Sequence, residues 1–275
     1  MEVLLHQVRQ PAVAGAFYPA QPSTLAHDVK ALLAHARPAA ESDGRACKAL
    51  IVPHAGYIYS GATAALAYAR LSASRTTIRR VVLLGPTHRV AVRGLALPGV
   101  EAFATPLGRV EIDLDAVAAI ASLPQVSVSA AAHALEHSLE VQLPFLQLAL
   151  DDFKLLPLAV GDATPAEVAE VLESLWGGAE TLIVVSSDLS HYLPYRSAQA
   201  FDHATTQRIL GLGSTLTHEQ ACGATPLNGL LRAARHHQLQ PQLLQLCNSG
   251  DTAGDKARVV GYAAFAFTQD APHAH

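Results

Sequence analysis

Residues 181–192, TLIVVSSDLSHY, carry the pattern that decides the fold, an apolar and β-branched run followed at once by polar side chains. The pattern recurs in residues 49–61 (ALIVPHAGYIYSG), 81–89 (VVLLGPTHR) and 242–251 (QLLQLCNSGD). Continuous apolar runs of this kind are typical of buried strands in a mostly parallel sheet. Because open α/β sheets bind ligands beyond the carboxyl ends of their strands, the four runs predict one pocket at one sheet edge.

Segments with helical spacing alternate with the predicted strands. Residues 164–176, TPAEVAEVLESLW, begin with an N-cap threonine and a proline at the first helical position. Alternating strands and helices predict an α/β fold with a mixed central sheet and helices on both faces. Strands are expected over residues 48–53, 80–84, 153–160, 181–185, 242–246 and 258–267, with weaker candidates at 94–97 and 110–114. Helices are expected over 115–122, 136–150 (bent or started anew around Pro144), 197–213, 217–222 and 225–237 among others.

The composition narrows the class of protein. Half of the 275 residues are hydrophobic and only 15% are charged, which favours a compact globular chain. The net charge of −4, without a run of Lys or Arg, gives no support for a nucleic-acid partner. No apolar stretch reaches the ~20 residues that cross a bilayer, and the first residues lack a signal-peptide pattern, so a cytoplasmic protein is expected. We expect one domain over residues 1–275, with its core at about 8–267 and a flexible tail at 268–275.

The three cysteines are widely spaced and include no CxxC pair, so they predict neither a disulfide framework nor a zinc knuckle. Cys47 and Cys222 are interpreted as small structural side chains. Cys247 follows a predicted strand, in the same position as His54 and His88, and is interpreted as a functional thiol. Imidazole and thiolate are ligands that first-row transition metals prefer, so these three residues predict a metal or redox site. The alternative is that each histidine only caps its strand.

Asp188 and His191 are three residues apart, so one helical turn would place them on the same face. A carboxylate that orients an imidazole fixes its tautomer and raises its basicity. The pair is therefore a candidate for moving protons, with Asp188 as a simple helix N-cap as the other interpretation. In the segment EHSLEVQ, residues Glu136, His137 and Glu140 lack the second histidine of an HExxH zinc motif, and they line either a pocket wall or a solvated helix face.

Seven motifs together resemble the Memo family, whose bacterial and archaeal members are called AmmeMemoRadiSam system protein B. They are VAGAFYP, PHAGYIYSG, GPTHR, EHSLEVQLPF, SSDLSHY, CNSGDT and GYAAFAF, and they run in the family's order from about Val8 to Phe267. The family is similar in fold to the class III extradiol (LigB-like) dioxygenases, which implies a three-layer α/β/α sandwich.

The resemblance also implies roles for individual residues. By it, His54, His88 and Cys247 match the metal ligands and His191 matches the acid/base histidine. Cys247 falls where the dioxygenases carry a glutamate, so extradiol ring cleavage is not expected. Phe17, Tyr18, Tyr57, Asp188 and Arg196 are expected in the pocket by the same resemblance.

These observations support three functions. The first is a metal-dependent oxidoreductase that uses iron or copper, with zinc as a further option, on a small-molecule or peptide substrate. The second is a non-catalytic binding or effector module, and the third is a metal carrier. The family name also implies a radical-SAM protein and an AMMECR1-like protein as partners.

Overall fold

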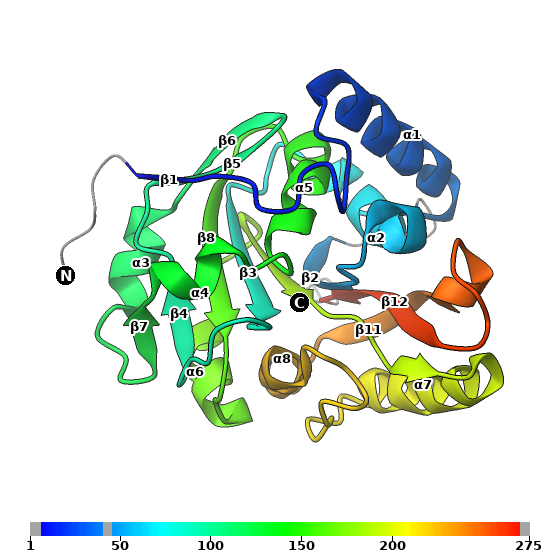
Figure 1. The fold of residues 1–275 in the computed structure, drawn as a ribbon. Coiled ribbons are helices and arrows are strands. Elements are labelled where there is room, and N and C mark those ends of the chain that lie inside the picture. The colour runs from blue at the N-terminus through cyan, green and yellow to red at the C-terminus, as the bar shows by residue number, and fades with distance from the viewer. Residues whose placement is uncertain (1–6, 41–45, 270–275) are drawn as a thin grey trace, which may run out of the picture.

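The computed structural model describes residues 7–40 and 46–269, and its largest feature is a mixed nine-stranded sheet (Figure 1). The strand order is β10-β12-β2-β9-β3-β8-β4-β7, and β11 pairs with β12. The bounds are β2 (Cys47–Val52), β3 (Arg80–Pro86), β4 (Leu95–Leu97), β7 (Val126–Val128), β8 (Lys154–Val160), β9 (Thr181–Ser186), β10 (His191–Leu193), β11 (Gln240–Asn248) and β12 (Val259–Thr268).

The centre of this sheet is parallel. β2 pairs with β9, β9 with β3 and β3 with β8, all in parallel register. Nearly every residue of these four strands is buried, as expected for strands that are covered on both faces. Because neighbouring parallel strands end at the same edge, the segments after β2, β9 and β3 emerge side by side.

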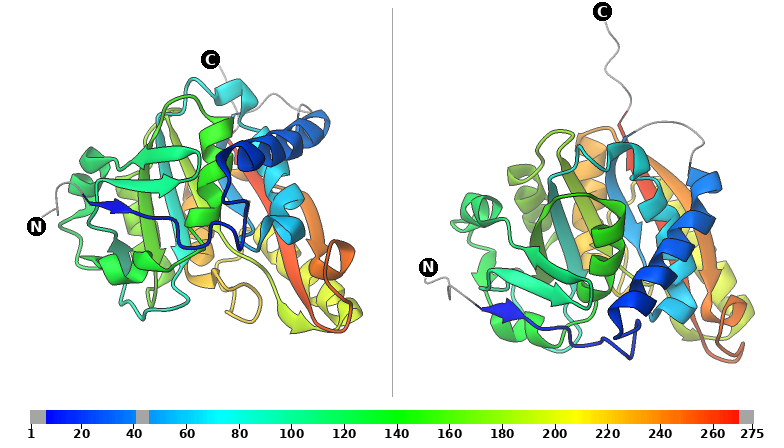
Figure 2. Two further views of the ribbon diagram at one scale, coloured as in Figure 1. Left: turned by 45° about the horizontal axis from the view of Figure 1, so that its top comes forward. Right: turned by 90° about the horizontal axis from the view of Figure 1, so that it is seen from above.

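Helices cover both faces, which confirms the predicted three-layer α/β/α arrangement (Figures 1 and 2). One layer holds α1 (Pro22–Ala40), α2 (Tyr57–Ala69) and α5 (Leu143–Ala149), and the other holds α6 (Pro165–Ser174), α7 (Tyr195–Leu210) and α8 (Ala224–His236). Thr164 caps α6 in a capping box with Glu167, as its sequence predicts. The short helices α3 (Leu114–Ile120) and α4 (Ala130–Ala134) lie near the β7 end of the sheet (Figure 1).

A second, three-stranded sheet has no counterpart in the sequence prediction except part of its last strand. It consists of β1 (Val8–Arg9), β5 (Ala102–Thr105) and β6 (Gly108–Glu111), with β1 parallel and β6 antiparallel to β5. Strands of two to four residues are too short to produce a clear periodic pattern, which explains why the sequence analysis missed them.

Two helical predictions are wrong, and a third is right only from Leu143 onward. Residues 217–222 form turns, and residues 136–150 contain only a 3₁₀ turn at Glu140–Gln142 followed by α5. The segment between Asp188 and His191 is extended, because the Leu189 N–H donates to the Gly261 carbonyl and the Gly261 N–H donates to the Ser190 carbonyl. These bonds hold the segment against β12 and exclude a helical turn.

The last strand runs one residue further than the sequence predicts. Thr268, expected to begin a flexible tail, is the last residue of β12, and residues 270–275 lie outside the described part. Within residues 7–40 and 46–269, the structure has no helix whose length and hydropathy would allow it to cross a bilayer.

Candidate metal centre

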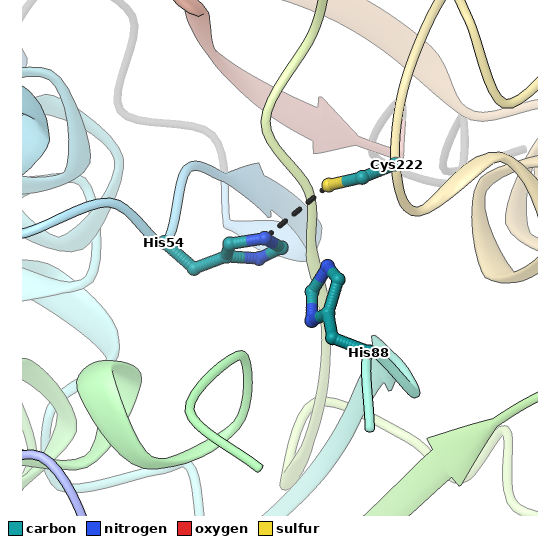
Figure 3. A group of neighbouring side chains, drawn as sticks. All are labelled: His54, His88 and Cys222. Carbon is teal, nitrogen blue, oxygen red and sulfur yellow. Dashed lines mark hydrogen bonds between the residues drawn. The ribbon is translucent and has the colours of Figure 1, made fainter. Parts of the chain in front are cut away.

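Two histidines and a cysteine meet at the carboxyl edge of the parallel strands. His54 follows β2, His88 follows β3, and Cys222 lies in the loop before α8. Their ligand atoms all lie within 4.8 Å of one another, and the three side chains point toward a common point (Figure 3). The His54 and His88 ring centroids are 5.2 Å apart, and the Cys222 Sγ lies 3.2 Å from the His54 Nε2.

The fold brings Cys222 to this edge through the segment that follows β9. The Cys222 N–H donates to the Asp188 carbonyl, and the Gly223 N–H donates to the Ser187 Oγ. A Cβ at Gly223 would lie 2.7 Å from the Ser187 Cβ, so a residue without a side chain is needed for this close approach. β9 lies between β2 and β3 in the sheet. The segment after β9 therefore holds the Cys222 loop between the His54 and His88 side chains.

Hydrogen bonds orient the His88 ring. The Glu136 carboxylate accepts from the His88 backbone N–H at 2.7 Å and contacts the Nδ1 at 2.9 Å. Burial raises the pKa of Glu136, but the hydrogen bonds from His88 and Ser138 outweigh it and hold the pKa at about 2. Because an ionised carboxylate only accepts, the His88 Nδ1 carries a proton, which leaves the Nε2 as the ring nitrogen that can bind a metal ion.

The His54 ring is oriented in the same sense by a hydroxyl. The Ser186 Oγ donates to the Ser138 carbonyl at 2.6 Å, so it accepts from the His54 Nδ1–H at 2.9 Å and from the Gln142 Nε2. The His54 Nε2 therefore presents its lone pair toward Cys222. Burial keeps the pKa of His54 well below its ordinary value, and the neighbouring histidines lower it further, so the ring is neutral.

Burial dominates the protonation of the remaining groups. It raises the pKa of the Cys222 thiol to about 12, with a contribution from the charge of Asp188. It also raises the pKa of Asp188 to about 7, against the hydrogen bond that the carboxylate accepts from the His54 N–H. Two imidazoles and a thiol that loses its proton on binding are donors that fit a transition-metal ion. The residues present therefore suit such an ion.

Cys247 does not join this cluster, which corrects the predicted ligand set. Its Sγ lies 3.2 Å from the Thr63 Oγ1 on α2, and it belongs to none of the ligand groups among the described residues. The reason is topological, because Cys247 pairs with Tyr262 of β12, and β12 lies between β11 and β2. Two strand spacings of ~4.8 Å separate β11 from the strand that carries His54.

Asp188 and His191 do not form the predicted pair. Asp188 accepts from the His54 N–H at 2.8 Å, while the His191 Nδ1 donates to the Leu189 carbonyl at 2.9 Å. His191 is exposed as a residue at the start of β10, but its ring is partly desolvated by its neighbours, and this desolvation lowers its pKa below the ordinary value. The Leu189 carbonyl, rather than a carboxylate, therefore sets the tautomer of His191.

A third histidine adjoins the cluster. The His137 ring stacks on His88 with centroids 4.8 Å apart and lies edge-on to His54 at 5.3 Å. Burial lowers the pKa of His137 to about 4, so this ring is also neutral at physiological pH. His88, Glu136 and His137 form a second group of potential ligands that shares His88 with the first. Phe17 packs on the other side of His137 at 4.9 Å.

The other predicted pocket residues have different surroundings. The buried Glu140 pairs with Arg9 and accepts from the Tyr18 hydroxyl, and the Tyr57 hydroxyl donates to the Val141 carbonyl. Arg196 is exposed on the first turn of α7. Phe17, Tyr18 and Tyr57 also line an apolar groove of about 940 Å³ between the N-terminal loop, α1 and α2. Phe17 thus contacts both the groove and the histidine cluster.

Cys222 was interpreted from the sequence as a small structural side chain. It does not follow a predicted strand, so the strand-end pattern did not point to it as a ligand. The signal that was present is the dipeptide Cys222–Gly223 directly before a strongly amphipathic helix, where a glycine allows the backbone to approach a neighbouring segment. Loops at helix N-termini reach the same sheet edge as strand ends do, so they supply ligands equally well.

Comparison with known proteins identifies the relatives of this chain. The family model described as Memo-like protein matches residues 9–266. The chain belongs to the Memo family. A MEMO1 family protein of Methanosarcina barkeri is 35% identical over 94% of this chain and 98% of its own length. One from Aquifex aeolicus is 37% identical over 95% of this chain and 99% of its own.

A solved structure shares the fold of this chain. The crystal structure of protein JW3007 from Escherichia coli K12 superposes with a TM-score of 0.50 and covers 79% of this chain and 98% of its own. Its sequence identity is 16%, so the likeness concerns the fold alone.

Proposed function

We propose that this Memo-family protein binds iron or copper through His54, His88 and Cys222 and acts as a metal-dependent oxidoreductase. The observation that carries the proposal is the convergence of one ligand atom from each of two imidazoles and one thiol within 4.8 Å. Mixed nitrogen and sulfur donors suit copper, iron and zinc rather than the hard cations Mg²⁺ and Ca²⁺.

The surrounding side chains prepare the site for such an ion. Glu136 and Ser186 hold the two Nδ1–H groups, so the Nε2 atoms of both rings are the nitrogens left to bind an ion. His88 is partly exposed, with 30% of its side chain accessible, which leaves a way in for a small substrate. When bound, iron or copper would supply one-electron transfer.

Two further histidines are placed to handle protons. His137 stacks on His88, and His191 presents its Nε2 because its Nδ1–H is held by the Leu189 carbonyl. We assign His191 the transfer of a proton between the substrate and solvent, since it is the exposed member of the pair. Asp188 acts as a positioning residue, because its carboxylate holds the backbone of His54 and its carbonyl holds that of Cys222.

Metal content tests the ligand set. Protein purified without oxygen is reconstituted with Fe²⁺ or Cu⁺, desalted and analysed for bound metal. We expect about one ion per chain in the wild type. We expect the affinity to fall at least about tenfold in Cys222→Ser, because a hydroxyl is a far poorer ligand for these ions than a thiolate. Cys247→Ser is the matched control and should bind like the wild type.

Two outcomes would contradict the proposal in different ways. Loss of metal in Cys247→Ser with retention in Cys222→Ser would restore the ligand set predicted from the sequence. Stoichiometric Fe²⁺ or Cu⁺ that neither gives an electron to an added oxidant such as ferricyanide nor consumes oxygen with ascorbate as the reductant would replace the oxidoreductase with a metal carrier.

A further inference from the structure

A separate group of three side chains that could bind a metal ion lies away from the candidate metal centre. Glu173 is on the last turn of α6, and His236 and His237 end α8. Their ligand atoms lie within 4.8 Å of one another, although α6 and α8 are far apart in the sequence. None of the three takes part in the proposed function.

The packing of α6 on α8 creates this group. A Cβ at Gly229 of α8 would lie 2.2 Å from the Val168 Cγ1 of α6, so the two helices touch backbone to side chain at this point. From there both helices continue toward their C-termini, five residues to Glu173 and seven to His236 (173 − 168 and 236 − 229). The close crossing therefore fixes where the carboxylate and the imidazoles meet.

The side chains are held by contacts beyond the group itself. The His237 ring stacks on Trp176, with centroids 3.7 Å apart and an interplanar angle of 9°. The His237 Nε2 lies 2.8 Å from a Glu173 carboxylate oxygen, and the two histidine rings are perpendicular with centroids 5.0 Å apart. A ring fixed by stacking loses less conformational entropy when it takes up a ligand, which favours binding.

We propose that Glu173, His236 and His237 form a second metal site for a divalent transition cation such as Zn²⁺ or Ni²⁺. Two imidazoles and one carboxylate are the usual ligands of such ions, with open positions left for water. Bonds of ~2.1 Å place tetrahedral ligand atoms ~3.4 Å apart, so side-chain shifts of about 1 Å complete the site. The side chains of His237 and Glu173 are 22% and 39% exposed, which allows the ion to exchange with solvent.

This site lies near the opposite end of β2 from the candidate metal centre. The Lys48 Nζ lies 5.4 Å from the centre of the Trp176 ring, and Lys48 is the second residue of β2, whereas His54 follows its last residue. At ~3.3 Å per residue, the six positions from Lys48 to His54 span about 20 Å. A signal from Trp176 therefore reports on the second site and not on the first.

The test uses Trp176, the only tryptophan in the chain, as a reporter. Ni²⁺ quenches indole fluorescence at contact, and Zn²⁺ does not, because its d shell is full. We expect Ni²⁺ to quench the emission of the full-length protein along a saturable curve, and Zn²⁺ to restore it by competition. His236→Gln and Glu173→Gln should each raise the Ni²⁺ midpoint at least about tenfold, as expected for the loss of one ligand.

His203→Gln is the matched control, because His203 is also exposed on a helix of the same layer but has no place in the group. It should leave the midpoint unchanged. The proposal is overturned if quenching rises linearly without saturation, if Zn²⁺ does not reverse it, or if the three variants behave alike.

Discussion

His133 is a buried histidine whose surroundings do not stabilise the doubly protonated, charged form of its ring. Its Nε2–H donates to the Ala96 carbonyl at 2.8 Å, while the buried Nδ1 has no hydrogen-bond partner within residues 7–40 and 46–269. Burial lowers the pKa of His133 to about 4, with a contribution from the charge of Arg9. The unfolded chain, with an ordinary histidine pKa of ~6.5, therefore binds a proton between about pH 6.5 and 4 that the folded protein does not.

This difference predicts how stability depends on pH. The contribution of His133 is fully present above about pH 6.5 and is lost as the pH falls toward 4, at about 1.4 kcal/mol per unit of pH. Urea unfolding at pH 7 and pH 5 measures it. His133→Gln keeps a donor for Ala96 but cannot titrate, so it should lose about 2 kcal/mol less than the wild type between these pH values. Equal losses in both proteins would show that His133 is not the titrating group.

At the scale of the elements, the crossing of α6 and α8 leaves no room for an added side chain at Gly229. In an exposed helix, Gly→Ala stabilises by up to about 1 kcal/mol. At Gly229 the added Cβ would lie 2.2 Å from the Val168 Cγ1, so the helices must separate. We expect Gly229→Ala to lower the free energy of unfolding by about 2 kcal/mol, the usual cost of overpacking.

Thermal unfolding distinguishes the gain in helix propensity from the cost of the clash, because the first raises the midpoint of Gly229→Ala and the second lowers it. Arg232→Ala, at an exposed position of the same helix, is the control and should change the midpoint little. A higher midpoint in Gly229→Ala would mean that helix propensity outweighs the clash and that the two helices are free to move apart.

The elements also show what a sequence can and cannot predict. The long buried strands and the capped helix α6 were predicted because their patterns are local, as the capping box of Thr164 and Glu167 illustrates. His54 and His88 follow strands that both flank β9 in the sheet, so strand-end reasoning was enough to place them. Cys222 and Cys247 could not be distinguished in this way, because the choice depends on β12 lying between β11 and β2. Strand order is a property of the whole sheet.

At the scale of the whole molecule, one buried network ties the N-terminal segment to the loop behind the candidate metal centre. The Glu140 carboxylate pairs with Arg9 and accepts from the Tyr18 hydroxyl and from the N–H groups of Ala12 and Val13. Arg9 also donates to the carbonyls of residues 133 and 136. The network therefore joins the smaller sheet to the residues that hold His88.

Removing one charge of this buried network should lower the free energy of unfolding far more than breaking an exposed ion pair does. We expect Glu140→Gln to lower the free energy of unfolding by about 3–5 kcal/mol, because Arg9 is left buried without a counter-charge. Arg75→Gln breaks the exposed pair with Asp151 and should cost less than about 1 kcal/mol. Urea unfolding measures both.

The double variant Arg9→Met/Glu140→Gln tests which effect destabilises Glu140→Gln: the loss of the ion pair, or the Arg9 charge that is left buried without a partner. Without Arg9 no charge of this pair remains buried, and the side-chain amide introduced by Glu140→Gln keeps one of the two oxygens that accept from the Ala12 and Val13 N–H groups. We therefore expect the double variant to be more stable than Glu140→Gln alone, with slower hydrogen exchange at those two amides. If its stability loss instead equals the sum of the two single losses, the pair acts through independent contacts, and the stranded charge of Arg9 does not explain the cost.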